Sequence, residues 1–85
     1  MPGRLTEEAF LAQFAASVLE VTDQPLPEDF SLDDRFAHLE LDSMSRLEVI
    51  ACLEDRLQVV IDDTTLSRTV TGRDLYEAVA ERVAA

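Results

Sequence analysis

Residues 40–57 read Glu-Leu-Asp-Ser-Met-Ser-Arg-Leu-Glu-Val-Ile-Ala-Cys-Leu-Glu-Asp-Arg-Leu, in which an acidic turn leads into a run with helical periodicity. Asp42 is a favourable N-cap, because its carboxylate can accept a hydrogen bond from a backbone N–H of the first turn. The spacing predicts an amphipathic helix from Ser43 to Leu57. We expect its core face to consist of Leu47, Ile50, Ala51 and Leu57.

A second amphipathic pattern precedes this stretch, between Leu5 and Glu20. Thr6 is a suitable N-cap, and the acidic residues Glu7 and Glu8 lie next to the positive end of the helix dipole. The pattern therefore predicts a first helix. Its apolar stripe contains Phe10, Leu11, Phe14, Ala15 and Val18.

The segment between the two predicted helices, residues 21–42, is a long acidic connection. Pro25 and Pro27 exclude a helix across them, because proline lacks the backbone N–H and restricts the residue before it. The apolar residues of the segment are too frequent for a solvated linker. We expect a loop that lies on the core, with a helical turn from Ser31 to Phe36. The anchoring residues are Phe30, Leu32, Phe36, Leu39 and Leu41.

Weaker signals follow the central helix. The run from Val59 to Ile61 is β-branched, but no second strand can pair with it, so we interpret it as a buried connection. We expect a short helix from Asp62 to Ser67. Thr71-Gly72-Arg73-Asp74 is a variant of the capping box and predicts the start of a last helix. The apolar face of that helix contains Leu75, Ala78, Val79 and Val83.

Together these elements predict an all-α fold, a small four-helix bundle with three longer helices, one short helix and a long loop between helices one and two. We expect residues 1–85 to form a single domain. A domain of this size has little room for an enclosed substrate pocket, which argues against a stand-alone enzyme.

The charge balance restricts the class of partner. Lys and Arg total 7 against 18 Asp and Glu, which gives a net charge of −11. This charge repels phosphate backbones and anionic headgroups, so we expect no nucleic acid and no membrane as partner. Cys52 is the only cysteine, which excludes an internal disulfide and indicates a reducing compartment and a buried thiol. The N-terminus shows no apolar signal segment, and we expect a cytoplasmic protein.

Residues suited to catalysis or metal binding are scarce. His38 is the only histidine, and we interpret it as a loop residue and not as a catalytic base. The acidic pairs at 33–34 and 62–63 lack the alternating carboxylates and central Gly of a calcium loop. Cys52 has no neighbouring His or Lys in sequence, which is typical of a packing residue. We therefore expect no catalytic residue and no metal site.

The stretch Leu41-Asp42-Ser43-Met44, at the entrance to the central helix, resembles the attachment motif of acyl carrier proteins. The usual form of that motif is Asp-Ser-Leu followed by a helix with acidic residues. The length, the helix order, the acidity and the Thr71 cap also fit the family, and the resemblance covers nearly the whole chain. Further matching positions are Leu47-Glu48-Val49, Leu53-Glu54-Asp55-Arg56-Leu57, Ile61 and Asp63.

The resemblance implies that a separate phosphopantetheinyl transferase attaches 4′-phosphopantetheine from coenzyme A to Ser43. A monomeric carrier would then hold an acyl group as a thioester and present it to acyl-loading, chain-extending or acyl-transfer enzymes with basic docking patches. Asp42 would cap the helix and form part of the transferase's recognition surface. Partner recognition would involve Met44, Arg46, Glu48, Glu54 and Asp55.

Departures from the family pattern bear on the subclass. Glu40, Gln58 and Asp62 stand where the family often has Gly, Gly and Pro. Gln58 leaves two expectations open: it ends the helix in the left-handed conformation, at a cost of about 1 kcal/mol, or the helix ends differently. Glu40 and Ser45-Arg46 favour a free-standing carrier of a polyketide-type or related pathway over the fatty-acid type.

Two alternatives remain open. One is a discrete peptidyl or aminoacyl carrier, although the Gly-Gly-Asp/His-Ser signature of that class is missing. The other, from a different class, is an unmodified acidic helical adaptor that binds a basic partner. Replacing Ser43 by Ala would leave the adaptor functional and would inactivate a carrier.

Overall fold

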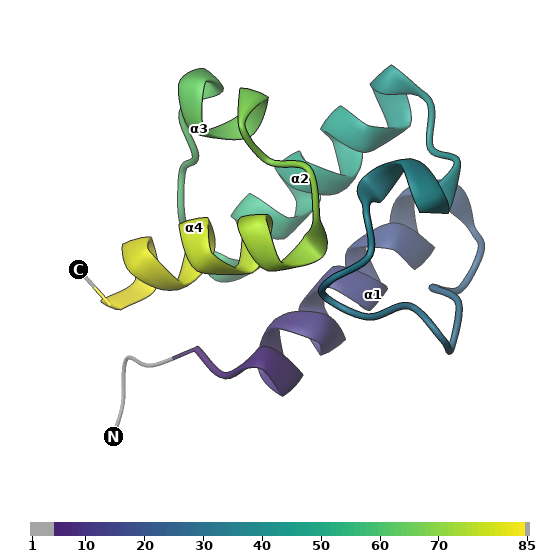
Figure 1. Cartoon of the computed structure of the whole chain (residues 1–85), viewed down its shortest axis with the longest axis horizontal. Helices are drawn as coiled ribbons and strands as arrows, with labels where there is room; N and C mark the ends of the chain where they lie inside the picture. Colours follow the sequence, from purple (N-terminus) through teal and green to yellow (C-terminus); the bar gives the residue numbers. More distant parts are fainter. Residues whose placement is uncertain (1–4, 85) are drawn as a thin grey trace.

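Residues 5–84 are described by a computed structural model of the chain, and they form four α-helices and one turn of 3₁₀ helix (Figure 1). Within this range there is no β-strand, only an isolated bridge between Arg35 and Thr71. The predicted all-α bundle is therefore confirmed. No helix among these residues has the length and apolar character needed to cross a lipid bilayer. In chain order the elements are α1 (Glu7–Thr22), η1 (Phe36–Leu39), α2 (Ser43–Leu57), α3 (Asp63–Ser67) and α4 (Gly72–Ala84).

Side-chain caps set the helix starts. α4 begins with a capping box, in which Asp74 N donates to Thr71 Oγ1 (3.2 Å) and Thr71 N donates to Asp74 Oδ2 (3.1 Å). Thr6 caps α1 and Asp62 caps α3 by accepting a hydrogen bond from a first-turn N–H. The predicted caps at Thr6 and Thr71 and the predicted bounds of α2 are confirmed, whereas Asp62, predicted as the first residue of the short helix, is its cap. α1 runs over Glu7–Thr22 and begins later than predicted, because its cap lies outside the helix.

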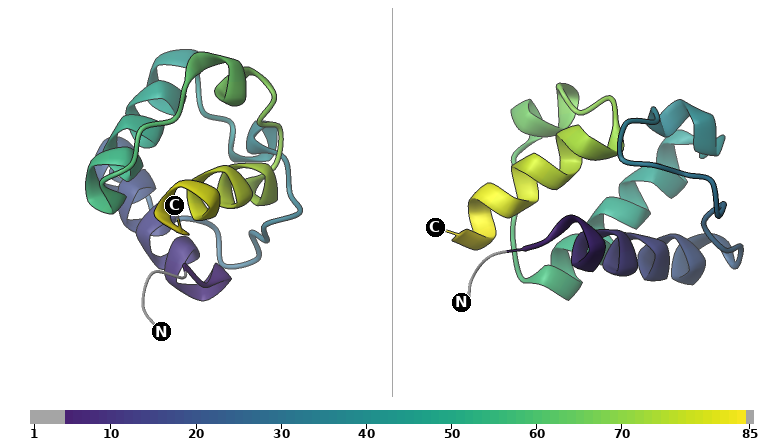
Figure 2. Two further views of the ribbon diagram at one scale, coloured as in Figure 1. Left: turned by 90° about the vertical axis from the view of Figure 1, so that its left-hand side faces the viewer. Right: turned by 60° about the horizontal axis from the view of Figure 1, so that its bottom comes forward.

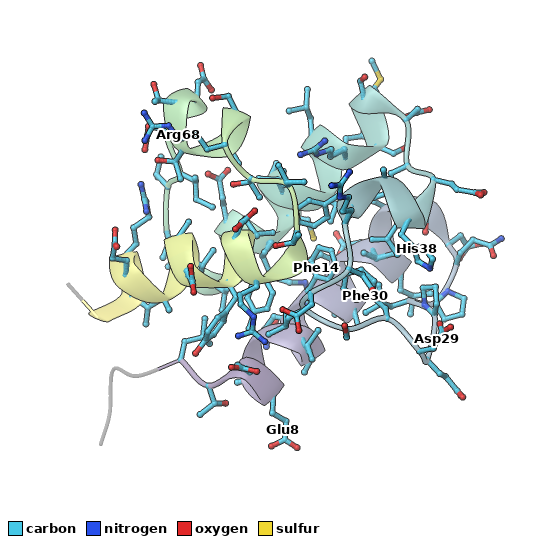
Figure 3. All side chains as sticks on the ribbon, in the orientation of Figure 1. Glu8, Phe14, Asp29, Phe30, His38 and Arg68 are labelled. Atoms are coloured by element: carbon cyan, nitrogen blue, oxygen red, sulfur yellow. The ribbon has the colours of Figure 1, made fainter. Side chains whose placement is uncertain are left out.

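An aromatic cluster fills the centre of the bundle, where Figure 3 shows Phe14 and Phe30 close together. The ring centroid of Phe14, on α1, is 5.8 Å from those of both Phe30 and Phe36 in the long connection. Phe10 contacts Tyr76 of α4 edge-on, with centroids 5.5 Å apart. The prediction that the connection lies on the core is thus confirmed. The other buried members of this core are Val18, Leu32, Val49, Leu53, Ile61, Leu75 and Val79.

The buried face of α2 agrees with the prediction at Ile50 and in part at Leu57, and differs from it elsewhere. Val49, Ile50 and Leu53 are its buried residues, whereas Leu47 is 62% exposed and Ala51 is also exposed. The physical reason is that α1 packs along one side of α2 (Figure 2) and buries only the stripe that faces it. The sequence pattern alone gave a stripe that was rotated too far around the helix.

The helical turn in the long connection lies at Phe36–Leu39 and not at Ser31 to Phe36. Ser31 instead begins a separate turn, in which the Ser31 N–H donates a hydrogen bond to Asp34 Oδ2 (2.9 Å). The prediction of one helical turn was therefore right in kind and wrong in position.

The interpretation of residues 59–61 as a buried connection is only partly right. Ile61 is buried, but Val60 is 83% exposed. The expectation of a buried thiol also needs correction, because Cys52 is half-buried. Both residues lie at the edge of the core, where packing covers one side of the backbone only.

The long connection also lies against the start of α4 (Figure 2). Gly72 N donates to Asp34 O (3.1 Å), and Arg73 N donates to Leu32 O (2.6 Å). A Cβ at position 72 would lie 3.2 Å from Leu32 O, which is a tight contact, so the close approach of the two backbones favours glycine. These contacts hold in place the chain that leads into α2.

Candidate functional site

Ser43 is the first residue of α2, and it is exposed. Asp42 before it has an extended backbone (φ −75°, ψ 172°), and its Oδ1 accepts a hydrogen bond from Ser45 N (2.7 Å). The first N–H groups of a helix have no carbonyl partner within the helix. The Ser43 hydroxyl therefore lies at a helix end that favours negative charge.

The electrostatics of Asp42 follow from its capping role, which the structure confirms. Hydrogen bonds from the Ser45 N–H and then from the Ser45 hydroxyl lower the pKa of the Asp42 carboxyl below its ordinary value. The group is therefore ionised at neutral pH and keeps the cap formed. In addition, Arg46 N donates to the backbone oxygen of Asp42 (2.9 Å), which starts the helical hydrogen-bond ladder.

A groove of about 430 Å³ lies beside Ser43, between α2 and α3, and we call it the α2–α3 groove. Ser43, Leu47 and Ile50 follow one another at i, i+4 and i+7, so they share one stripe of the helix. Leu47, Ile50 and Leu66 make part of the lining apolar. The complete lining is Ser43, Arg46, Leu47, Ile50, Asp63, Leu66 and Ser67.

Arg46 is part of the lining of this groove, and its guanidinium contacts two buried residues. Its guanidinium carbon is 5.2 Å from the centroid of the Phe36 ring, and its Nη2 donates to Thr69 O (2.8 Å). Phe36 and Thr69 are both buried. The ion pairs formed among residues 5–84 join other arginines to carboxylates and do not include Arg46. A role for Arg46 in partner recognition stays a prediction.

The other predicted recognition residues differ in their surroundings. Met44 is 70% exposed, and Glu48 and Asp55 are exposed on the same helix. Glu54 is half-buried, and its Oε2 accepts a hydrogen bond from Ile61 N (2.6 Å). Glu54 thus fixes the chain after α2, whereas Met44, Glu48 and Asp55 are exposed. Their part in recognition also stays a prediction.

Sequence reasoning did not identify the lining of the groove. Leu47 was assigned to the core, although its position four residues after Ser43 places it on the same side of the helix. Leu66 and Ser67 offered no signal, because the sequence does not show on which side of α2 the short helix α3 packs. His38 is exposed in η1, and residues 5–84 contain no cluster of metal-ligating side chains.

Comparison with known proteins adds independent information. Residues 9–79 match the family model described as "Phosphopantetheine attachment site". An acyl carrier protein of Streptomyces coelicolor is 35% identical over 89 aligned positions, which cover 100% of this chain and 94% of that protein. The monensin polyketide synthase acyl carrier protein of Streptomyces virginiae is 38% identical over 63 positions, which cover 74% of this chain and 72% of the relative. No solved structure matches the chain significantly.

Proposed function

This chain belongs to the acyl carrier protein family, whose members carry acyl groups on 4′-phosphopantetheine, and we propose that Ser43 is the residue to which the arm is attached. The observation that carries the proposal is the place of Ser43. It is an exposed hydroxyl at the first position of α2, inside the matched range 9–79 and next to the α2–α3 groove.

The residues around Ser43 fit a phosphodiester-linked arm. The hydroxyl is accessible to a modifying enzyme, and the helix N-terminus supplies a favourable electrostatic environment for the phosphodiester anion. The groove beside it gives the arm and its cargo an apolar surface, with Leu47, Ile50 and Leu66. The arm supplies a terminal thiol that holds the acyl group as a thioester.

The protein's own residues perform binding and presentation. Asp42 keeps the first turn of α2 formed and thereby holds the backbone of Ser43 at the start of the helix. The buried residues Val49 and Leu53 hold α2 against the rest of the bundle. Family members are carriers and not catalysts, and we assign no catalytic residue to this chain.

We place the carrier in a polyketide-type pathway. The relative from Streptomyces virginiae is named as a polyketide synthase component, and the departures at Glu40 and Ser45-Arg46 agree with this subclass. If fatty-acid synthase enzymes loaded and extended a chain on it as efficiently as on their own carrier, this assignment would fail.

Partner enzymes are expected to dock on the exposed side of α2. Met44 and Leu47 offer apolar contact area, while Glu48 and Asp55 add negative charge for basic patches. Asp42 completes this acidic surface next to Ser43. Such charge pairs mainly increase the rate of encounter and are weakened by salt.

The test of the attachment site is intact mass after incubation with coenzyme A, Mg²⁺ and a broad-specificity phosphopantetheinyl transferase. The parent protein should gain one phosphopantetheinyl unit, and Ser43→Ala should gain none. Ser67→Ala is the matched control, since Ser67 is an exposed hydroxyl that lines the same groove. Absence of any gain on folded parent protein, with several transferases, would favour the unmodified acidic adaptor.

The docking surface is tested by Glu48→Lys, measured as the rate of modification at low salt. We expect a decrease of about three- to tenfold that shrinks as the ionic strength rises. Glu81→Lys makes the same change of charge on α4 and should have little effect. An equal effect of the two variants would show that only net charge matters.

A further inference from the structure

The arginines of this acidic chain differ in what they bind. Arg56, Arg73 and Arg82 each form an ion pair with a carboxylate. Arg46 contacts a carbonyl oxygen and an aromatic ring instead. A guanidinium has five N–H donors, and the contact with Thr69 O uses one nitrogen. Among the described residues the other guanidinium nitrogens form no hydrogen bond, and Arg46 is one of the residues that line the α2–α3 groove.

The position of this cation is fixed. The Phe36 ring lies against the guanidinium (5.2 Å), and Thr69 O holds Nη2 at 2.8 Å. Both partners are buried, while Ser43 is exposed. A chain attached to Ser43 and folded back into the groove thus passes from an exposed attachment point toward the half-buried cation.

We propose that Arg46 donates a hydrogen bond to a carbonyl oxygen of the chain carried on Ser43 when that chain occupies the α2–α3 groove; this rests on the proposed function. The apolar lining from Leu47, Ile50 and Leu66 accommodates a hydrocarbon chain. However, a saturated chain that covers the Arg46 guanidinium removes water from N–H groups that have no other acceptor, which is unfavourable. A carbonyl oxygen uses a donor that a saturated chain leaves unpaired. Arg46 therefore favours oxo-substituted over saturated acyl chains.

The experiment uses the full chain in four states: unmodified, modified with the arm alone, carrying butanoyl and carrying 3-oxobutanoyl. The loaded forms are made by the transferase from the corresponding acyl-coenzyme A, and intact mass confirms each one. The readouts are the NMR signals of the Arg46 Nε–H and of the Ile50 and Leu66 methyl groups. Failure of the mass step would refute the attachment site itself and is thereby distinguished from failure of this inference.

We expect the Arg46 Nε–H signal to move most with 3-oxobutanoyl, which has a carbonyl that butanoyl lacks. A shift already complete with the arm alone identifies the arm's amide carbonyls as the acceptor and overturns the preference for oxo-substituted cargo. Identical Arg46 signals in all four states would overturn the proposal as a whole.

Variants separate binding from structure. Arg46→Gln should lower the groove occupancy of the 3-oxobutanoyl chain relative to butanoyl about tenfold, the effect of one charge-assisted hydrogen bond in a partly exposed site. Arg68→Gln makes the same change of charge outside the groove and should leave that ratio unchanged. If Arg46→Gln does not fold, the Nε–H shifts of the parent protein decide by themselves.

Discussion

α2 has contacts of opposite character on its two sides. Toward α1 it presents Val49 and Leu53, which are almost completely buried. Toward α3 it forms a groove, and α3 itself has no buried residue. Two arginines contribute polar contacts to the segment around α3: Arg82 Nη2 binds Asp62 Oδ1 (2.9 Å), and Arg46 Nη2 binds Thr69 O (2.8 Å).

This difference separates rigidity from adaptability within a small domain. Burial of large apolar side chains resists local opening, whereas exposed polar contacts open at low free energy. The contact with α1 therefore gives Ser43 a fixed base, and the α3 side of the groove can adjust to what is carried. Each of the following predictions tests whether the two sides of α2 differ in this way.

The largest effect is expected from substitutions in the two contacts. Leu53→Ala should lower the free energy of unfolding by about 3 kcal/mol, because it leaves a cavity among buried side chains. Leu66→Ala, on the half-buried side chain of α3, should cost about 1 kcal/mol. Urea denaturation followed by circular dichroism measures both. Equal losses of stability would mean that α3 packs as tightly as the core, and the proposed difference between the two sides of α2 would be wrong.

The same contrast explains which features the sequence predicts. The caps at Thr6 and Thr71 depend on hydrogen bonds within one turn, so local sequence is sufficient to find them. Ser43 could be found because its motif is contiguous. The inward position of Arg46 depends on Thr69, which is 23 residues away in sequence, and no local pattern encodes that contact.

The buried stripe of α2 illustrates the same limit. Leu47 and Val49 are both apolar, and periodicity permits either to face the core. The packing of the other elements decides that Val49 is buried in the core and that Leu47 stays exposed in the lining of the groove. The sequence therefore predicts the helices and the family, and it supports the proposal for Ser43, but it does not predict the lining of the groove beside that residue.

Acid should affect the α3 side before the α1 side. Hydrogen bonds from the Thr65 hydroxyl and N–H lower the pKa of Asp62, so its contribution to stability is complete above the ordinary value of 3.8 and is lost as the pH falls through the lowered pKa. We expect the NMR signals of α3 to lose their native positions below about pH 4, while those of Val49 and Leu53 persist to lower pH.

Asp62→Asn provides the matched variant for this titration, because asparagine is also a good N-cap but does not titrate. It should remove much of the acid sensitivity of α3. Asp29→Asn, on an exposed loop residue, should leave it unchanged. Simultaneous loss of α2 and α3 signals in the parent protein would contradict the independence of the two sides.

The smallest effect concerns the joint between the two sides, where Gln58 ends α2 in the left-handed conformation (φ 56°), which is one of the two outcomes that the sequence left open. Gln58→Gly removes the steric penalty of a side chain there but makes the unfolded chain more flexible, so the expected net gain is about 0.5 kcal/mol. Asp23→Gly is the matched control at the end of α1 (φ 60°). Because aspartate tolerates this conformation better than glutamine, its gain should be smaller. Hydrogen exchange would then show whether removing the steric strain at position 58 affects α3. Faster exchange in α3 despite higher global stability would identify residue 58 as the hinge of the groove. Unchanged exchange would assign the adaptability of this side to the polar contacts of α3 alone.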